Sequence, residues 1–318
     1  MDYRFRLLNV FAESQFGGNP LCVFEDARGL DALQMQTLAA QFNLSETVFL
    51  LPPHDTNALA SLRIFTTTSE LPFAGHPTIG AASVVAALKP GFDCFMLQCQ
   101  AGLIEIRGES LLTPATPIAP APAPVKASHW TLTVPVNQNK TFDECFRTPT
   151  QDLHFFAQLL GLQGSDFLSE PMWVNTGNEH LLFPLNSAQA LERANPNAAM
   201  LEAWPSSLAG RQNAYLFAIE GDQSGGGDAE NLTVSARYWF VKQGSIAVDP
   251  ATGSAAANWA AWHLRHRHGR KFAAQVKQGH QINRPSKLLV SAEIDTNQVP
   301  RIQVGGNAIE IGSGVLHL

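Results

Sequence analysis

The chain has 318 residues and the composition of a mildly acidic globular protein. Hydrophobic residues make up 45% and charged residues 15%, and 21 Lys and Arg against 27 Asp and Glu give a formal net charge of −6. This balance argues against nucleic acid and anionic membranes as partners. The N-terminal residues lack the apolar core of a signal peptide, and no segment is long and apolar enough to span a bilayer, so we expect a cytoplasmic protein.

The length exceeds that of one ordinary domain and favours two lobes. Strand patterns dominate the first part, with strands expected at residues 1–7 and 21–24 on either side of a turn at 17–20. Asp31 and Gln34 resemble the capping pair of a helix that continues to about residue 42. β-Branched and aromatic residues predict a strand that starts at Glu46 and another at 62–66.

Residues 78–88 predict a helix that ends before Pro90 and is apolar on nearly every face. A helix without a polar face has to be enclosed. Because strands precede and follow it in the sequence, the simplest enclosure is a sheet curled around it. The sequence therefore predicts a lobe built as a sheet around one central helix.

Five prolines within residues 113–124 favour an extended polyproline conformation. We place the lobe boundary there, with lobes at 1–118 and 119–318, and leave open whether the last strands pack back on the first lobe. The alternative is a long surface loop within one domain. Residues 221–227 predict a flexible glycine-rich insertion.

The second part repeats the plan of the first. Further strands are expected at 130–136, 179–184, 214–219, 235–240, 287–292, 300–304 and 308–312, with helices near 151–160 and 254–264. Gly305, Gly306 and Asn307 predict a hairpin turn between the last two strands. The histidines of 262–271 are interpreted as a solvated helix end, not as a metal site.

Two helix openings of one design stand about 170 residues apart. The first is the segment 70–82 and the second is 249–257, and each combines a Pro, a Gly, a hydroxyl residue and a run of small side chains. Pro suits the first helical position, and the free N–H groups that follow attract anions. The pair predicts one two-sided site for an anionic ligand.

Three segments resemble the signature blocks of the phenazine-biosynthesis PhzF-like isomerase family: 43–49, 71–78 and 249–255. The resemblance extends to Gly18-Asn19-Pro20, to residues 175–177 and 181–185, and to Gln278-Gly279 and 284–286. It implies the α+β fold of diaminopimelate epimerase. In that fold, two similar lobes each roll a mostly antiparallel sheet around a central helix, and the active site lies in the cleft between them.

The resemblance also implies roles for individual residues. Glu46 corresponds to the catalytic glutamate, with His76 and Asp249 as its partners. Substrate-binding residues are then Asn19, Ser45, Gly75, Thr78, Gly253 and Ser254, which supply donors for a substrate carboxylate. The implied reaction is a cofactor-independent isomerisation that moves a proton between carbons of a small carboxylate-bearing substrate, and the family suggests a homodimer.

Local sequence alone also allows ordinary structural roles for these residues. Glu46 could cap a strand end, His76 could be a hydrogen-bonded loop histidine, and Asp249 could be a helix N-cap. A carboxylate withdrawn from water is a better base for a carbon-bound proton. At the start of a helix, the imidazole of His76 should be neutral. Val248 departs from the acidic residue expected before Asp249, which leaves the preferred ligand open.

Two other functions compete with the isomerase. The first is an amino-acid racemase or epimerase of the related fold, of which the two-thiol type needs a cysteine on each side of the site. The four cysteines lie outside both helix openings and are expected to be reduced and buried: Cys22, Cys94, Cys99 and Cys145. The second is a binding protein that kept the pocket without the chemistry.

Overall fold

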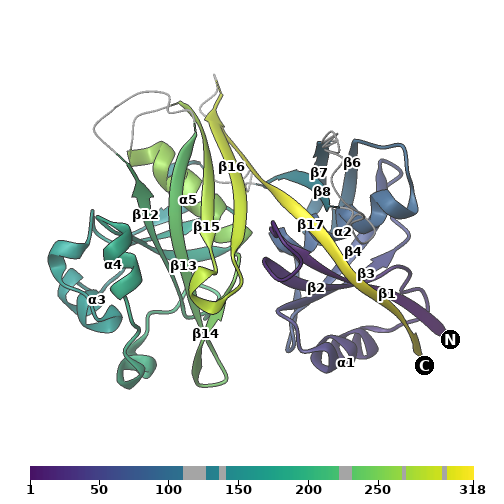
Figure 1. Cartoon of the computed structure of the whole chain (residues 1–318), viewed down its shortest axis with the longest axis horizontal. Coiled ribbons are helices and arrows are strands. Elements are labelled where there is room, and N and C mark those ends of the chain that lie inside the picture. Colours follow the sequence, from purple (N-terminus) through teal and green to yellow (C-terminus); the bar gives the residue numbers. More distant parts are fainter. Residues whose placement is uncertain (110–126, 136–140, 222–230, 267–269, 296–298) are drawn as a thin grey trace, which may run out of the picture. The chain divides into compact units, whose positions relative to one another are not determined.

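The computed structural model describes residues 1–109, 127–135, 141–221, 231–266, 270–295 and 299–318 (Figure 1). These residues divide into two compact units, Met1–Thr133 with Gly305–Leu318, and Val134–Val304. The proline-rich segment 113–124 and all but the first residue of the glycine-rich segment 221–227 lie outside the described residues. None of the helices in the described ranges combines the length and hydrophobicity needed to cross a membrane.

The first unit is a ring of paired strands. Its strands are β1 (Asp2–Val10), β2 (Asn19–Phe24), β3 (Glu46–Leu51), β4 (Ala58–Phe65), β5 (Glu70–Leu71), β6 (Cys94–Cys99), β7 (Gly102–Glu109), β8 (Ala127–Thr133) and the later part of β17 (Pro300–His317). The pairings run β1–β2–β3–β4–β6–β7–β8–β17 and return to β1. The β2–β3 and β4–β6 pairs are parallel, whereas β1–β2, β1–β17, β3–β4, β6–β7 and β7–β8 are antiparallel, so the sheet is mostly antiparallel.

Helix α2 (Gly75–Leu88) lies inside this ring, where it contacts β1, β2, β3, β4 and β8 (Figure 1). All of its first eight residues are buried. Gly80 permits the close packing, because a Cβ there would lie 2.3 Å from Leu21 Cδ2. The enclosure expected for a helix without a polar face is confirmed.

Helix α1 (Ala32–Phe42) packs on the outside of the ring against β3 and β4. The predicted capping pair is confirmed. The Gln34 N–H donates to Asp31 Oδ1 at 2.8 Å, and the Asp31 N–H donates to Gln34 Oε1 at 2.9 Å. The buried face of the helix joins Phe24 and Phe49 in one apolar cluster.

The second unit is a run of strands with helices on both faces. Its strands are β9 (Phe146–Arg147), β10 (Met172–Asn175), β11 (Glu179–Pro184), β12 (Asn213–Glu220), β13 (Leu232–Lys242), β14 (Ser245–Asp249), β15 (Lys271–Gln278), β16 (Ser286–Ile294) and the first residues of β17. Its helices are α3 (Leu153–Leu160), α4 (Ala188–Arg193) and α5 (Gly253–His266), with short 3₁₀ helices at Asp143–Cys145, Gly164–Asp166, Ala198–Ala203 and His280–Ile282. The strands pair in the order β9–β10–β11–β12–β13–β15–β16, and β14 pairs with the end of β13.

Helix α5 occupies the concave face of this sheet. It contacts β10 and β16, which lie near opposite ends of the strand run, so the sheet curls around it (Figure 1). On β12, the Phe217 ring contacts Trp259 and Trp262 of α5, whereas Leu216 points to the other face and packs in a cluster with α3 and α4. Each unit is therefore a mostly antiparallel sheet around one helix, and the predicted α+β fold is confirmed.

The hairpin predicted at residues 305–307 is wrong. Strand β17 runs unbroken from Pro300 to His317, and neither Gly305 nor Gly306 has a positive φ. Gly305 is needed for close packing, because a Cβ there would lie 2.4 Å from Thr131 Oγ1 of β8. Gly305 therefore permits the close approach of β8, and the segment does not make a turn.

Candidate active-site residues

Glu46 and His76 meet in the first unit. In the parallel β2–β3 pair, Leu21 lies opposite Glu46, so Glu46 opens β3 beside the start of β2. His76 is the second residue of α2. The His76 Nε2 atom lies 3.5 Å from Glu46 Oε2, and the side chains are only 6% and 18% exposed. Two of the three predicted catalytic residues are therefore neighbours in a shielded environment.

Burial sets the charge of His76. Loss of solvent lowers its pKa to about 3, although a hydrogen bond to the Pro20 backbone opposes this shift. Proline has no N–H, so a ring N–H of His76 donates to the Pro20 carbonyl. Because Nε2 makes no hydrogen bond among the described residues, that donor is Nδ1. The ring is neutral, and the Nε2 lone pair faces the Glu46 carboxyl group.

The predicted substrate-binding residues of the first unit differ in the contacts that they make. Asn19 begins β2 and is fully buried, and the Ser45 hydroxyl donates to its Oδ1 at 3.4 Å. Gly75 begins α2 with its N–H at the helix start, as expected. Thr78 differs from the prediction, because its buried hydroxyl donates to Ala74 O at 2.8 Å. This hydroxyl therefore supports the helix start and does not face solvent.

In the second unit, Asp249 ends β14 and begins the turn to α5. It does not cap the helix directly, since three residues separate it from Gly253. Its Oδ2 accepts a 2.5 Å hydrogen bond from the Thr252 hydroxyl. Gln278 of β15 ties down the same turn, because its Nε2 donates to Asp249 O at 2.8 Å and to Thr252 Oγ1 at 3.0 Å. The orientation of the carboxylate is fixed from two sides.

Gly279 lies directly beneath this turn. Its φ is +79°, and a Cβ there would lie 2.3 Å from Arg284 O and 2.6 Å from Pro250 O. Only glycine adopts this backbone conformation readily and leaves room for both carbonyls. The Gln278-Gly279 pair, which the resemblance picked out without a role, is thus the support of the Asp249 turn.

Gly253 and Ser254 open α5. The Ser254 hydroxyl lies 2.9 Å from His180 Nε2, and the Tyr238 hydroxyl lies 3.1 Å from His180 Nδ1. Burial lowers the pKa of His180 to about 3, an effect strengthened by the charge of Arg211 and opposed by a hydrogen bond with the Asn213 side chain. Sequence reasoning missed His180 and Tyr238, because no local pattern links residues on β11 and β13 to a helix start.

The predicted residues thus fall into two groups. Glu46, His76, Asn19, Ser45, Gly75 and Thr78 lie in the first unit, whereas Asp249, Gly253 and Ser254 lie in the second. That both groups serve one substrate stays a prediction from the sequence.

The cysteines agree in part with expectation. All four are free, but Cys94 is exposed while the other three are buried. Burial raises the pKa of the Cys22 and Cys99 thiols, which disfavours the thiolate form that a cysteine base needs.

Comparison with known proteins decides the family. The sequence matches the family model described as phenazine biosynthesis-like protein (PhzC-PhzF) over residues 8–314. The chain belongs to this family. An uncharacterized isomerase of Pasteurella multocida is 36% identical to it, with 99% of this chain and 94% of the relative covered. The trans-2,3-dihydro-3-hydroxyanthranilate isomerase of Pseudomonas chlororaphis is 31% identical, with 99% and 100% covered.

A solved structure supports the fold of this PhzC-PhzF family member. The PhzF family protein of Bacillus anthracis matches with a TM-score of 0.78 over 100% of both chains, at 19% sequence identity. That likeness concerns the fold alone. The names of the two relatives support an isomerase assignment in general.

Proposed function

We propose that this PhzC-PhzF family member moves a proton between two carbons of a small carboxylate-bearing substrate, without a cofactor. The observation that carries the proposal is the pairing of Glu46 with the lone pair of His76 Nε2 at 3.5 Å in a shielded environment. A carboxylate with little water around it is a strong base toward carbon, and a neutral imidazole beside it can accept a hydrogen bond from its protonated form.

The proposed steps use one base for both transfers. The Glu46 carboxylate removes a proton from a substrate carbon, and the electron pair of the broken C–H bond moves into the adjacent π system. The new carboxyl O–H donates to His76 Nε2, which keeps the proton from bulk water. Glu46 then returns the proton to a different carbon, and the double bonds of the substrate have shifted. No atom is gained or lost.

Substrate binding is assigned to the two helix starts. The backbone N–H groups at Gly75 and Gly253 and the hydroxyl of Ser254 are suited to a carboxylate. The Asp249 carboxylate, held by Thr252, is suited to an amino group on the same molecule. An amino acid-like substrate would satisfy both, and the Pseudomonas chlororaphis relative is named for one, a dihydro-hydroxyanthranilate. This compound is the first to test.

The test is hydrogen exchange in deuterated water. Wild-type protein is incubated with trans-2,3-dihydro-3-hydroxyanthranilate and with related cyclic amino acids, and carbon-bound deuterium and double-bond position are read by NMR and mass spectrometry. We expect conversion with partial deuterium incorporation for the wild type, and none for Glu46→Gln. Partial incorporation is expected because a shielded base returns the original hydrogen in some turnovers, before that hydrogen exchanges with the solvent.

The control replaces an acidic residue that has another task in the same unit. Glu310→Gln removes one of two carboxylates that bind Arg6, so Arg6 keeps Glu25 and conversion should persist. Inversion of a stereocentre with no double-bond shift would favour a racemase or epimerase. Equal ligand binding by wild type and Glu46→Gln, with no exchange in either, would favour a binding protein. Either result would overturn the proposal.

A further inference from the structure

Three side chains from separate elements of the second unit form a continuous line of hydrogen-bonding groups. Tyr238 of β13 contacts His180 Nδ1 at 3.1 Å, and His180 Nε2 contacts the Ser254 hydroxyl at 2.9 Å. Tyr238 and His180 are only 8% and 5% exposed, whereas Ser254 at the start of α5 is partly accessible. The line therefore connects the interior of the unit with a residue assigned to substrate binding.

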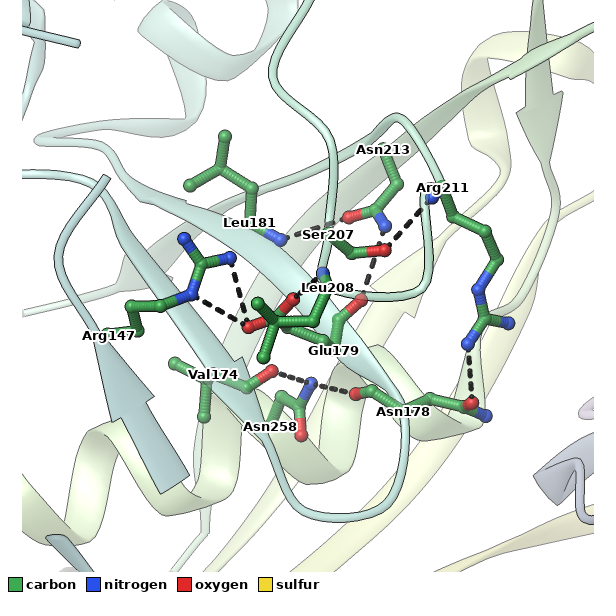
Figure 2. Close-up of polar contacts among 10 residues, drawn as sticks. All are labelled: Arg147, Val174, Asn178, Glu179, Leu181, Ser207, Leu208, Arg211, Asn213 and Asn258. Atoms are coloured by element: carbon green, nitrogen blue, oxygen red, sulfur yellow. Dashed lines mark hydrogen bonds and ion pairs between the residues drawn. The ribbon is translucent and has the colours of Figure 1, made fainter. Parts of the chain in front are cut away.

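The backbone on both sides of His180 is fixed by the side chain of Asn213. Its Nδ2 donates to Glu179 O at 3.2 Å, and its Oδ1 accepts from the Leu181 N–H at 3.0 Å (Figure 2). The Glu179 carboxylate is buried and bound by Arg147 at 3.1 Å and by the Leu208 N–H at 2.6 Å. The imidazole is thus attached to a segment that cannot shift without breaking buried polar contacts.

The preceding loop is tied to α5, the helix that carries Ser254. Asn258 Nδ2 donates to Val174 O at 2.6 Å and to Asn178 O at 2.8 Å, as Figure 2 shows, and its Oδ1 accepts from the Thr176 hydroxyl at 2.7 Å. Asn258 lies one helical turn beyond Ser254 on α5, so the turn that follows Ser254 holds the loop before His180. Serine and histidine are therefore held at a fixed separation.

A neutral imidazole donates through one nitrogen and accepts through the other, so the line has two possible directions. If Nδ1 carried the hydrogen, Nε2 would accept the Ser254 hydrogen, and Ser254 would present only lone pairs to a ligand. If Nε2 carries it, Ser254 accepts from His180 and its own hydrogen is free to point outward. A phenol donates more readily than it accepts, so the Tyr238 O–H is expected to donate to the Nδ1 lone pair, which favours the second direction.

We propose that Tyr238 and His180 are positioning residues that orient the Ser254 hydroxyl hydrogen toward a substrate carboxylate. This inference rests on the proposed function, in which Ser254 belongs to the carboxylate site. The Tyr238 hydroxyl donates to His180 Nδ1, the Nε2–H donates to Ser254, and Ser254 donates to the ligand. The backbone N–H groups of the helix start then meet the anion together with an aligned hydroxyl donor.

The first readout is independent of any substrate. In the ¹⁵N NMR spectrum of histidine-labelled wild-type protein, assigned with His180→Gln, we expect Nε2 of His180 to be protonated and Nδ1 to be bare. A protonated Nδ1 would overturn the inference, whatever reaction the protein catalyses. Loss of exchange activity on Glu46→Gln tests the proposed function separately, so the two failures are distinguishable.

The second readout compares two tyrosines. Tyr238→Phe removes the donor to His180, and we expect KM for the carboxylate substrate to rise about tenfold with kcat changed less than about threefold, since a ground-state contact is weakened. Tyr215→Phe is the matched control. Its ring lies 6.4 Å from that of Tyr238 on the neighbouring strand, and its buried hydroxyl has no hydrogen-bond partner among the described residues.

We expect Tyr215→Phe to keep the wild-type KM. Equal KM values for Tyr238→Phe and the wild type would overturn the inference, and so would equal increases in both variants, since these would report general repacking. His180→Gln retains a side-chain N–H that can donate to Ser254, whereas His180→Leu does not. A lower KM for the glutamine variant than for the leucine variant is expected, and the reverse order would contradict the positioning role.

Discussion

The neutral imidazole of His180 should make the second unit sensitive to mild acid. Burial, aided by the positive charge of Arg211, lowers the pKa of this histidine from 6.5 to about 3. In the unfolded chain the same group takes up a proton near pH 6.5. The unfolded state therefore binds more protons between these values, and the free energy of unfolding must fall as the pH falls through that window.

The size of the effect follows from the width of the window. The value pH 5 lies about 1.5 units below the pKa of this histidine in the unfolded chain. One pH unit is worth about 1.4 kcal/mol, so protonation of the unfolded chain at pH 5 lowers the free energy of unfolding by about 2 kcal/mol. Carboxylates also titrate as the pH is lowered, so the comparison is made between wild type and His180→Gln. Their difference in unfolding free energy should change by about 2 kcal/mol between pH 8 and pH 5, with the wild type losing more.

The assay uses the distribution of tryptophans. Five of the six lie in the second unit, at positions 173, 204, 239, 259 and 262, so tryptophan fluorescence during urea unfolding reports mainly on that unit. His54→Gln replaces an exposed histidine of the first unit and should leave the difference constant. A wild-type to His180→Gln difference that stays constant from pH 8 to pH 5 would refute the view that His180 is buried as a neutral ring.

Three further predictions concern the groups around the helix starts. Glu46→Asp, which keeps the charge but withdraws the carboxylate by one methylene, should lower kcat about 10²- to 10⁴-fold in the exchange assay, and a rate near that of the wild type would contradict its role as base. Gly279→Ala should lower the unfolding free energy by more than about 2 kcal/mol, since the cost of a left-handed backbone adds to overlap with two carbonyls. Gly244→Ala, at φ +73° with no atom within 4 Å, should show only the backbone cost in the same urea titration, and equal losses would argue against overlap. Gln278→Leu removes the hydrogen bonds of this side chain to the Asp249 turn and should lower the unfolding free energy by about 2–5 kcal/mol. Gln275→Leu removes one partly buried hydrogen bond and should lower it by less than about 1 kcal/mol. Equal losses for the two variants in thermal or urea unfolding would contradict this expectation.

Local signals predicted much of the secondary structure. The capping pair of Asp31 and Gln34 marked the start of α1, because a cap is completed by residues three positions apart. The strand predicted to start at Glu46 does start there, as β3 (Glu46–Leu51). The enclosure of α2 was also predictable, since a helix apolar on every face has no other stable environment.

Other features depend on residues that are far apart in the chain. Gly305 and Gly306 carry a turn signal, yet the strand continues through them, and the space at Gly305 is filled by β8, more than 170 residues earlier. Of the site, the residue types at positions 46, 76, 249 and 254 were readable from motifs. Their partners were not, since Gln278 and His180 approach the second helix start only through the pairing of distant strands.

The amino-acid sequence by itself determined which groups are the candidates for the proposed chemistry: a glutamate at a strand start, a histidine and a serine at helix starts, and an aspartate before a turn. Such choices are local, because caps, turns and apolar periodicity involve neighbours in the chain. Only the tertiary structure decided that His76 is neutral with a bare Nε2 toward Glu46, and that Ser254 meets His180. Protonation state and hydrogen-bond direction depend on burial and on partners that only folding brings together.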